Sequence, residues 1–407
     1  MTEARPRLLF VSPRFLFPAD QGGKIRTTQI LKGMKGGRFE IVLASPEGNG
    51  DAREYAQELE QICDRFIGWP QADPGPLHHI TRLRHLLSPL PVSVVSDDAT
   101  RGREVVGKAL SNGVDLAVFD FLHAMVLAPD DWDCRSLMFT HNVEAEIFAR
   151  HASVTRNPLK RAVWQQQYRK MQAYEHESLK RFDTVVAVSE RDAAAFRALE
   201  GVGQVEPIPT GVDLDFFAWR SPGNGDHIVF TGAMDWQANI DGIEFFMDEI
   251  WPSVVERRPG AHVTIVGRNP SPALVERARR RDLPFTFTGF VDDIRTHVVD
   301  AAAYIIPLRV GGGTRIKAFE AMAMGIPVVS TGLGVEGLPI TPDEHYLHGD
   351  TAADFADALV RLLEDGDLRQ RLSQQARAYV EAHCSSQAVA RRFDEICWQT
   401  LQGAESD

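Results

Sequence analysis

The sequence lacks several features that would place the chain in a special class of protein. Its 407 residues contain no run of about 18 apolar residues, the length that a transmembrane helix needs. The short apolar stretch "LLFVS" near the N-terminus is not followed by a small-residue cleavage site, so no signal peptide is expected. The 4 cysteines include no CxxC or CxxH pair, so we expect reduced, mostly packing cysteines in a cytoplasmic protein.

The chain also lacks a net positive charge, which argues against a general nucleic-acid binder. The formal net charge is −12, and it is unevenly distributed. Residues 1–212 hold 26 Lys and Arg against 27 Asp and Glu, a charge of −1. Residues 213–407 hold 18 against 29, a charge of −11, and the two values together give −12. The two halves of the chain therefore differ electrostatically, which the total conceals.

The chain does have the composition and the length of a two-domain globular protein. Short β-branched runs alternate with helical stretches, as in parallel sheets that helices cover on both faces. We therefore predict an α/β fold with two doubly wound Rossmann-like domains that face each other across a cleft. The predicted strands are 8–12, 40–45, 116–120, 136–141, 184–189 and 205–209 in the first series, and 227–232, 262–267, 285–289, 303–308 and 327–331 in the second.

A segment rich in Pro and Gly around 207–226 marks the predicted domain boundary. We expect an N-terminal domain over 1–210 and a C-terminal domain over 211–385. A final helix within 386–407 is expected to cross back to the N-terminal domain.

The stretch "GGGTRIKAFEAMAMGIPVVS" (311–330) carries the strongest chemical signal. Gly311, Gly312 and Gly313 precede a predicted helix with Thr314 as its N-cap, and free N–H groups at such a helix start favour an anion. Lys317 and Glu320 are three residues apart and share a helix face. A phosphate at the helix start and a ribose at Glu320 would fit this face. The alternative is a Gly-rich surface loop with solvated charges.

Two other nucleotide motifs are excluded by their context. "GGGTRIK" lacks the Gly-Lys-Ser/Thr that a Walker loop has at the required spacing. "GLGVEG" at 332–337 matches G-x-G-x-x-G, but Pro339 and Pro342 would break the helix that the dinucleotide fingerprint needs.

Taken together, the motifs resemble those of a known family. "IPLRVGGGTRIKAFEAMAMGIPVVSTGLGVEGL" resembles the donor-binding segment of the retaining family 4 glycosyltransferases (glycosyl transferases group 1), which have the two-Rossmann GT-B fold. "IPTGVDLDFF" resembles their interdomain junction, with Thr210 where Asn is usual. "PADQGGKIRT" and "FTHNVEAEIFAR" resemble their N-terminal glycine loop and their His-bearing segment. The chain looks most like sugar transferases associated with exopolysaccharide and PEP-CTERM gene clusters.

The resemblance implies roles for individual residues of the first half. Gly22 and Gly23 match the glycine loop that approaches the donor phosphates, and His141 matches the active-site His on the acceptor side. Asp120, at the end of a predicted strand, is expected to support the site. Without the resemblance, the glycines read equally well as a turn and His141 as a hydrogen-bonded structural residue.

In the second half, the resemblance comes with two departures. Glu320 matches the second Glu of a Glu-x7-Glu pair, which contacts the ribose, but Gly312 stands where the first Glu is expected. The sugar would then be held by the backbone around 311–314. The first loop of the donor domain, "GAMDWQAN", also lacks the Arg and Lys that neutralise the diphosphate in many members. The nearest candidate cations are Arg309, Arg315 and Lys317, and we expect Arg315 and Lys317 to replace the missing pair.

The resemblance implies a retaining, metal-independent, hexosyltransferase-type enzyme, and we expect His141, Arg315 and Lys317 to be its catalytic residues. No cofactor is expected beyond the nucleotide sugar, which is the donor substrate. The Asp213-Leu-Asp215 pair matches a metal-binding D-x-D motif of another glycosyltransferase fold, but so short a motif is common and we predict no metal site. Two alternatives remain open: a catalytically silent nucleotide-sugar-binding partner, and a GT-B-fold nucleotide-sugar epimerase.

The predicted partners are the nucleotide sugar and a glycan or polyprenyl-linked acceptor, in exopolysaccharide or cell-surface glycan synthesis; nucleic acid is not expected. The basic segment 159–181 is interleaved with Trp164, Tyr168 and Tyr174. Such a helix can lie on anionic lipid, so we also predict peripheral contact with the cytoplasmic face of the inner membrane. The alternative is a solvated helix face.

Overall fold

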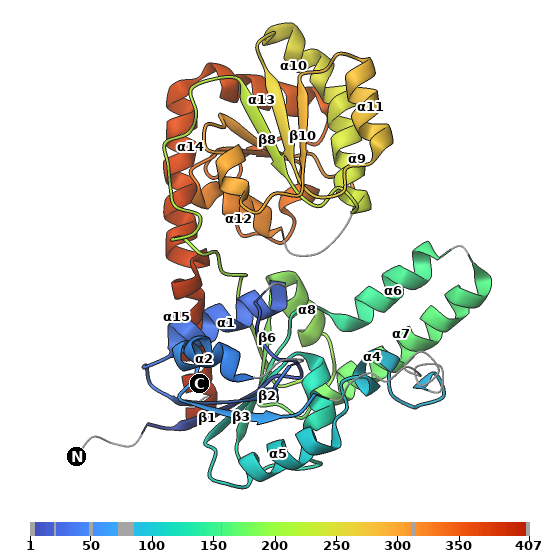
Figure 1. Cartoon of the computed structure of the whole chain (residues 1–407), viewed down its shortest axis with the longest axis vertical. Helices are drawn as coiled ribbons and strands as arrows, with labels where there is room; N and C mark the ends of the chain where they lie inside the picture. The colour runs from blue at the N-terminus through green and yellow to red at the C-terminus, as the bar shows by residue number, and fades with distance from the viewer. Residues whose placement is uncertain are drawn as a thin grey trace. The chain divides into compact units, whose positions relative to one another are not determined.

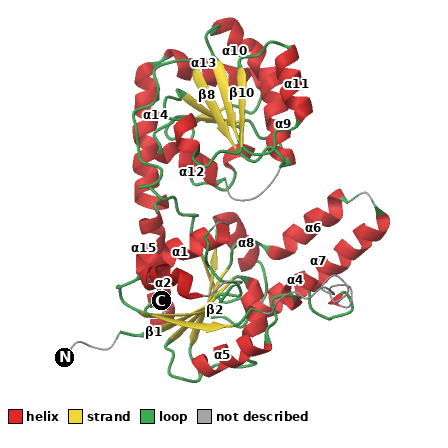
Figure 2. Ribbon diagram, viewed as in Figure 1, coloured by secondary structure: helices red, strands yellow, loops and turns green. Residues whose placement is uncertain are grey.

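The computed structural model describes residues 5–19, 22–48, 52–71, 85–155, 157–310 and 315–403. The chain forms two compact units, which we call unit 1 (Met1–Ile208 with Val389–Asp407) and unit 2 (Pro209–Ala388). Each unit has a sheet with helices around it (Figures 1 and 2).

In unit 1, parallel strands form a sheet in the order β3-β2-β1-β4-β5-β6-β7. Successive strand residues point to opposite faces, so Leu8 and Phe10 join one apolar cluster while Leu9 and Val11 join another. Both faces are therefore buried. The strands are β1 (Arg7–Val11), β2 (Glu40–Pro46), β3 (Arg65–Trp69), β4 (Leu116–Asp120), β5 (Arg135–Phe139), β6 (Thr184–Ala187) and β7 (Gln204–Pro207).

The helices of unit 1 cover the two faces of this sheet. Helices α1, α2 and α15 supply apolar side chains to the cluster of Leu8 and Phe10, whereas α5 and α8 supply them to the cluster of Leu9 and Val11. The helices are α1 (Gly22–Met34), α2 (Ala56–Ile62), α4 (Val92–Val95), α5 (Thr100–Leu110), α6 (Glu144–Val154), α7 (Pro158–Leu179), α8 (Glu190–Arg197) and α15 (Ser386–Gln402), with 3-10 turns η1 (Ala52–Tyr55) and η2 (Leu122–Leu127).

Unit 2 repeats this architecture, with parallel strands in the order β10-β9-β8-β11-β12-β13. Its strands are β8 (His227–Thr231), β9 (His262–Val266), β10 (Phe285–Gly289), β11 (Ala303–Ile306), β12 (Val328–Ser330) and β13 (Leu347–His348). Its helices are α9 (Gln237–Phe245), α10 (Trp251–Arg257), α11 (Pro272–Arg280), α12 (Ile316–Ala323), α13 (Ala352–Glu364) and α14 (Gly366–Tyr379), with short helical segments η3 (Phe246–Ile250), η4 (Ile294–His297), η5 (Leu333–Val335) and η6 (Val380–Cys384).

These two parallel sheets confirm the predicted doubly wound fold class. In both sheets the strand order reverses direction next to the first strand, between β1 and β4 and between β8 and β11. Ligands of such folds bind outside the carboxyl ends of the strands at this reversal. Those predicted site residues that fall within the described ranges lie at these two places, which are described separately below.

Helices α6 and α7 form a hairpin that projects away from the sheet of unit 1 (Figure 1). Its aromatic side chains are used inside the unit: Trp164 stacks on His151 with ring centroids 4.5 Å apart, and Tyr168 and Tyr174 pack against a buried cluster. The aromatic residues predicted to face lipid therefore pack largely against protein. Among the described residues, no helix combines the length and the apolar character that crossing a bilayer requires.

Candidate functional site

In unit 1, a buried polar group gathers at the carboxyl end of β4. Asp120 is the last residue of β4 and is fully buried. Its carboxylate accepts hydrogen bonds from Ser12 Oγ at 3.1 Å and from Thr27 Oγ1 at 3.2 Å. His141, two residues beyond β5, places Nε2 2.8 Å from Asp120 Oδ1. The structure thus brings the predicted His141 and Asp120 into direct contact.

The contact with Asp120 sets the proton arrangement of His141. Burial lowers the pKa of His141 below its ordinary value, while Asp120 raises it in part and Arg26 lowers it further. The imidazole is therefore neutral at neutral pH. Because the carboxylate accepts, the ring proton is assigned to Nε2, which leaves Nδ1 as the acceptor. Nδ1 lies toward α1, where a Cβ added to Gly23 would be 3.7 Å away.

The two glycines at the start of α1 differ in their surroundings. A Cβ on Gly22 would meet nothing within 4 Å, whereas a Cβ on Gly23 would lie 2.6 Å from Cζ of Phe121. The space that Gly23 leaves is therefore next to a protein ring. We predicted that this space serves the donor phosphates, and the structure adds a second reason for a glycine there.

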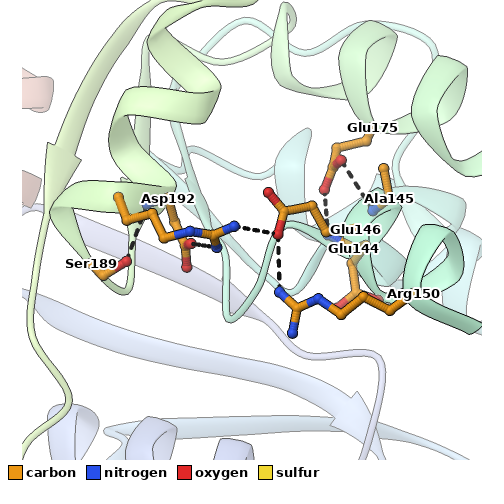
Figure 3. Close-up of polar contacts among 8 residues, drawn as sticks. Glu144, Ala145, Glu146, Arg150, Glu175, Ser189 and Asp192 are labelled. Atoms are coloured by element: carbon orange, nitrogen blue, oxygen red, sulfur yellow. Dashed lines mark hydrogen bonds and ion pairs between the residues drawn. The ribbon is translucent and has the colours of Figure 1, made fainter. Parts of the chain in front are cut away.

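The segment that follows His141 is held by a carboxylate from α7. Glu175 accepts the backbone N–H groups of Glu144 at 2.8 Å and Ala145 at 3.3 Å, at the N-terminus of α6 (Figure 3). Glu146 next to them pairs with Arg150 at 3.0 Å and with Arg191 of α8 at 2.7 Å. Burial raises the pKa of Glu175 to about 8. The N-terminus of α6 is therefore fixed from two neighbouring helices.

In unit 2, Lys317 lies beside the loop that leaves β8. The Lys317 ammonium donates to Asn239 Oδ1 at 3.0 Å and lies 4.4 Å from the centre of the Phe230 ring. A Cβ on Gly232 would be 2.8 Å from Lys317 Nζ, so the cation touches the carboxyl end of β8. Asn239 also donates to the carbonyl of Ala233 at 2.9 Å. The loop after β8, which has no Lys or Arg of its own, is therefore adjacent to Lys317 of α12.

Lys317 and Glu320 perturb each other in a partly buried setting. Burial lowers the pKa of Lys317 from 10.5 to about 7, although Glu320 raises it in part. Burial likewise raises the pKa of Glu320 from 4.5 to about 7. Among the described residues, the Glu320 carboxylate has no hydrogen-bond partner. Both side chains are therefore poised for partners that carry charge or hydroxyl groups.

The two arginines of the motif have other surroundings. Arg315 is buried and donates from Nε to the carbonyl of Leu333 at 3.1 Å, which ties the start of α12 to η5. Arg309 is exposed, stacks on the Phe245 ring at 4.3 Å and pairs with Asp241 at 3.0 Å and Glu249 at 3.3 Å. Lys317, by contrast, donates a hydrogen bond to Asn239 in the loop after β8.

The remaining predicted positions either lie outside the described residues or have other surroundings. Gly311, Gly312, Gly313 and Thr314 lie outside the described residues. The N-cap position of α12 falls at Arg315, whose side chain makes no capping hydrogen bond. Asp213 accepts the N–H groups of Asp215 and Phe216 at 3.0 and 2.9 Å, the geometry of a local turn. The 332–337 motif forms the short turn η5 and no α-helix of its own. Its Glu336 side chain is exposed.

Sequence reasoning missed several residues that build the site in unit 1. Ser12 and Thr27 hold Asp120, and Arg26 is buried with its guanidinium 5.0 Å from the Phe139 ring. Phe121 stacks on His141 with ring centroids 3.8 Å apart and an interplanar angle of 5°. Arg26 and Thr27 follow Gly22 and Gly23 within a few residues, and this closeness was the signal that could have identified them as site residues. Nothing in the sequence distinguishes Phe121.

Comparisons with known proteins bear on the family and the fold of the chain. The model of the family "Glycosyl transferases group 1" matches residues 225–365. The phosphatidyl-myo-inositol mannosyltransferase of Mycobacterium tuberculosis is 30% identical over 295 residues, which cover 68% of this chain and 70% of the relative.

Solved structures share the fold over almost the whole chain. The sucrose-phosphate synthase of Thermosynechococcus elongatus superposes with a TM-score of 0.66 at 18% identity, covering 98% of this chain and 100% of that one. HepE of Anabaena, solved with UDP, gives a TM-score of 0.65 at 14% identity, with coverage of 97% and 100%. The mannosyltransferase match and this shared architecture show that the chain belongs to the group 1 glycosyltransferases and has the GT-B fold.

Proposed function

We propose that this glycosyltransferase moves a hexose from a nucleoside-diphosphate sugar to a glycan or lipid-linked acceptor, with retention of the anomeric configuration and without a bound metal. The observation that carries the proposal is the position of Lys317, whose ammonium reaches the loop after β8. That loop follows the first strand of unit 2 at the reversal of strand order, where a diphosphate is expected. HepE of Anabaena was solved with UDP, which supports a nucleotide donor.

Each residue has a defined part in the proposed reaction. The acceptor hydroxyl oxygen bonds to the anomeric carbon while the bond from that carbon to the diphosphate oxygen breaks. The hydroxyl proton passes to the departing phosphate oxygen on the same face. Lys317 neutralises the charge that develops on the diphosphate, and Glu320 accepts the ribose hydroxyls. Arg315 holds the start of α12, and His141 orients the sugar through Nδ1.

The test compares Lys317→Ala with Lys180→Ala, which removes an exposed cation paired with Glu177. We expect Lys317→Ala to lower kcat/KM by about 10²-fold or more, since it removes a charge contact of the transition state. Lys180→Ala should keep the parental value. A Lys317→Ala enzyme within about twofold of the parent would contradict the proposal.

The same assay separates the proposed function from its two alternatives. Incubation with a panel of nucleotide sugars, followed by product analysis, reports transfer, epimer formation or no turnover. Slow release of the nucleotide from one donor supports a transferase. An epimerised donor would support the epimerase, and binding without turnover across the panel would support a silent partner.

A lipid-linked acceptor suits the outer surface of the α6–α7 hairpin. Leu159 and Val163 lie one helical turn apart on α7 and are 79% and 40% exposed. Lys160 and Arg161 between them are exposed and basic. We propose that these four residues, the α7 tip, contact anionic headgroups at the cytoplasmic face of the membrane. The similar mannosyltransferase is named for a phosphatidyl-inositol acceptor, which supports a lipid substrate.

Vesicle flotation tests the α7 tip. The parent should float with vesicles that contain an anionic phospholipid at low salt, and less with neutral vesicles. Lys160→Glu combined with Leu159→Ser should abolish this binding, whereas Lys108→Glu on the exposed side of α5 should not. Equal flotation with both vesicle types, or unchanged binding of the double variant, would contradict membrane contact while leaving the proposed transfer reaction intact.

A further inference from the structure

Phe121 has a backbone conformation that bulky residues avoid. It follows β4 with φ 66° and ψ 147°, a region populated almost only by glycine. In the described part of the chain, the other non-glycine residues with positive φ are Asn269, Asp282 and Asp343, which are of the types that tolerate it. Strained backbone of this kind persists only where its surroundings enforce it, and it gathers at functional sites.

The surroundings of Phe121 do enforce this conformation. Its N–H donates to the carbonyl of Phe139 at 2.9 Å, which continues the pairing of β4 with β5. Its carbonyl accepts the N–H of Ala124 at 3.0 Å, which begins η2. The backbone is thus held on both sides, and the side chain leaves it in a fixed direction.

That direction places the ring in contact with two parts of the site. On one side the ring lies parallel to the His141 imidazole, with centroids 3.8 Å apart and 5° between the planes. At its edge the ring reaches Gly23 at the start of α1, where an added Cβ would lie 2.6 Å from Cζ and 3.1 Å from Cε2. The same Cβ would lie 3.7 Å from Nδ1 of His141, so Gly23 borders both rings of the stack.

We propose that Phe121 is a positioning residue that fixes the orientation of the His141 imidazole and its spacing from the start of α1, and that Gly23 lacks a side chain in order to admit this ring. The inference rests on the proposed role of His141 in sugar transfer. It assigns Gly23 a protein contact in place of, or in addition to, a donor contact.

The ring has two physical effects on His141. It blocks rotation of the imidazole out of the plane in which Nε2 meets Asp120, and it excludes water from one imidazole face. The charged groups that face His141 are Asp120 from β4 and Arg26 from α1, and a second ring, Phe139, lies 4.5 Å away. Loss of the Phe121 ring leaves these neighbours in place but admits water, which raises the pKa of His141 toward its ordinary value.

A double-mutant cycle on the full-length enzyme tests the contact between Gly23 and Phe121. Gly23→Ala alone should lower kcat at least tenfold, because its Cβ displaces the ring. Phe121→Ala should lower kcat to a similar extent with little change in the KM for the donor. In the Phe121→Ala background, Gly23→Ala should then cost less than about twofold. Multiplicative losses would overturn the assignment of Gly23, since they are the result expected if its space served only the donor.

A readout that needs no activity separates this inference from the proposed function. We would titrate the His141 ring nitrogens by NMR in the parent, in Phe121→Leu and in Phe66→Leu, a control for loss of a ring on β3. The His141 midpoint should rise in Phe121→Leu and stay at the parental value in the control. An unmoved midpoint overturns the positioning role. A raised midpoint with unchanged kcat upholds the positioning of the imidazole and counts against the proposed role of His141.

Discussion

The conformation of Phe121 has a measurable cost at the scale of a single residue. A bulky side chain in a glycine-only region destabilises the folded state by about 1–3 kcal/mol. The ring contacts with His141 and with the start of α1 offset part of this cost. Phe121→Gly and Phe121→Ala both remove the ring, but only Phe121→Gly also relieves the backbone strain. Comparing their stabilities therefore separates the contribution of the backbone from that of the ring.

We predict that Phe121→Gly is more stable than Phe121→Ala by about 1–3 kcal/mol, since glycine adopts φ 66° without strain. Urea unfolding of the two variants, monitored by circular dichroism, measures the difference. A variant pair of equal stability would show that the backbone at this position relaxes when the ring is lost.

Lys317 gives a second prediction at this scale. With a pKa of about 7, the ammonium is largely deprotonated at pH 8, and a bound diphosphate would restore its proton. Binding of a nucleoside diphosphate at pH 8 should therefore take up protons, and its affinity should fall as the pH rises above 7. Titration calorimetry in buffers of different ionisation enthalpy reports the uptake. Lys317→Met should remove it, and an unchanged uptake in this variant would assign the proton to another group.

Individual site residues were predictable from the sequence to different degrees. The spacing of Lys317 and Glu320 placed both on one face of α12, because a helix fixes that relation locally. The contact of Lys317 with Asn239 depends on how α12 packs against the loop after β8, which no local pattern encodes. Phe121 was invisible for a similar reason, since its role arises from a backbone conformation and from two segments distant in sequence.

At the scale of elements, the joint between α6 and α7 depends on the protonation of Glu175. This carboxyl is 4% exposed, and burial raises its pKa to about 8, with Glu144 and Glu146 contributing in the same direction. The unfolded chain titrates near 4.5, so the folded state binds more protons between these values. The contribution of Glu175 to stability is therefore full below pH 4.5 and is lost as the pH rises through 8.

We predict that Glu175→Gln, which stays neutral and keeps one acceptor oxygen, removes this pH dependence. At pH 5 the variant should be less stable than the parent by about 1 kcal/mol, the value of one hydrogen bond. The difference should shrink or reverse by pH 8.5. Denaturant unfolding across this pH range measures it, with Glu177→Gln on the exposed side of α7 as the control. A constant difference would show that Glu175 ionises in the folded protein at its ordinary pH.

Elements with a continuous apolar pattern were predicted well, and the weaker ones were missed. The first predicted strand of each series corresponds to β1 and β8, and their continuous burial follows from sheets covered on both faces. β3 was missed because Arg65 and Gly68 interrupt its apolar pattern. β13 was missed because two residues are too few for any periodicity.

At the scale of the whole molecule, each unit has its own apolar core, so a ligand can stabilise one unit by itself. We predict that a nucleoside diphosphate at 100 times its Kd slows hydrogen exchange in unit 2 by about 100-fold, equivalent to about 2.7 kcal/mol. The effect should include α12 and the loop after β8, and exchange in unit 1 should stay near its value without ligand. Mass spectrometry of peptides from both units reports this, and slowing confined to unit 1 would contradict the assigned donor site.

The return of the chain to unit 1 has a consequence for its synthesis. Phe393, Ile396 and Cys397 of α15 complete the apolar cluster that also contains Phe10 and Ile30. A Cβ on Gly33 would lie 2.3 Å from Cβ of Ala390, so α1 and α15 touch closely. Unit 2 is continuous in sequence, so its core closes without residues from the rest of the chain. The N-terminal half keeps one sheet face incompletely covered until residues 389–402 emerge from the ribosome, so chaperones are expected to bind this half of the chain during synthesis.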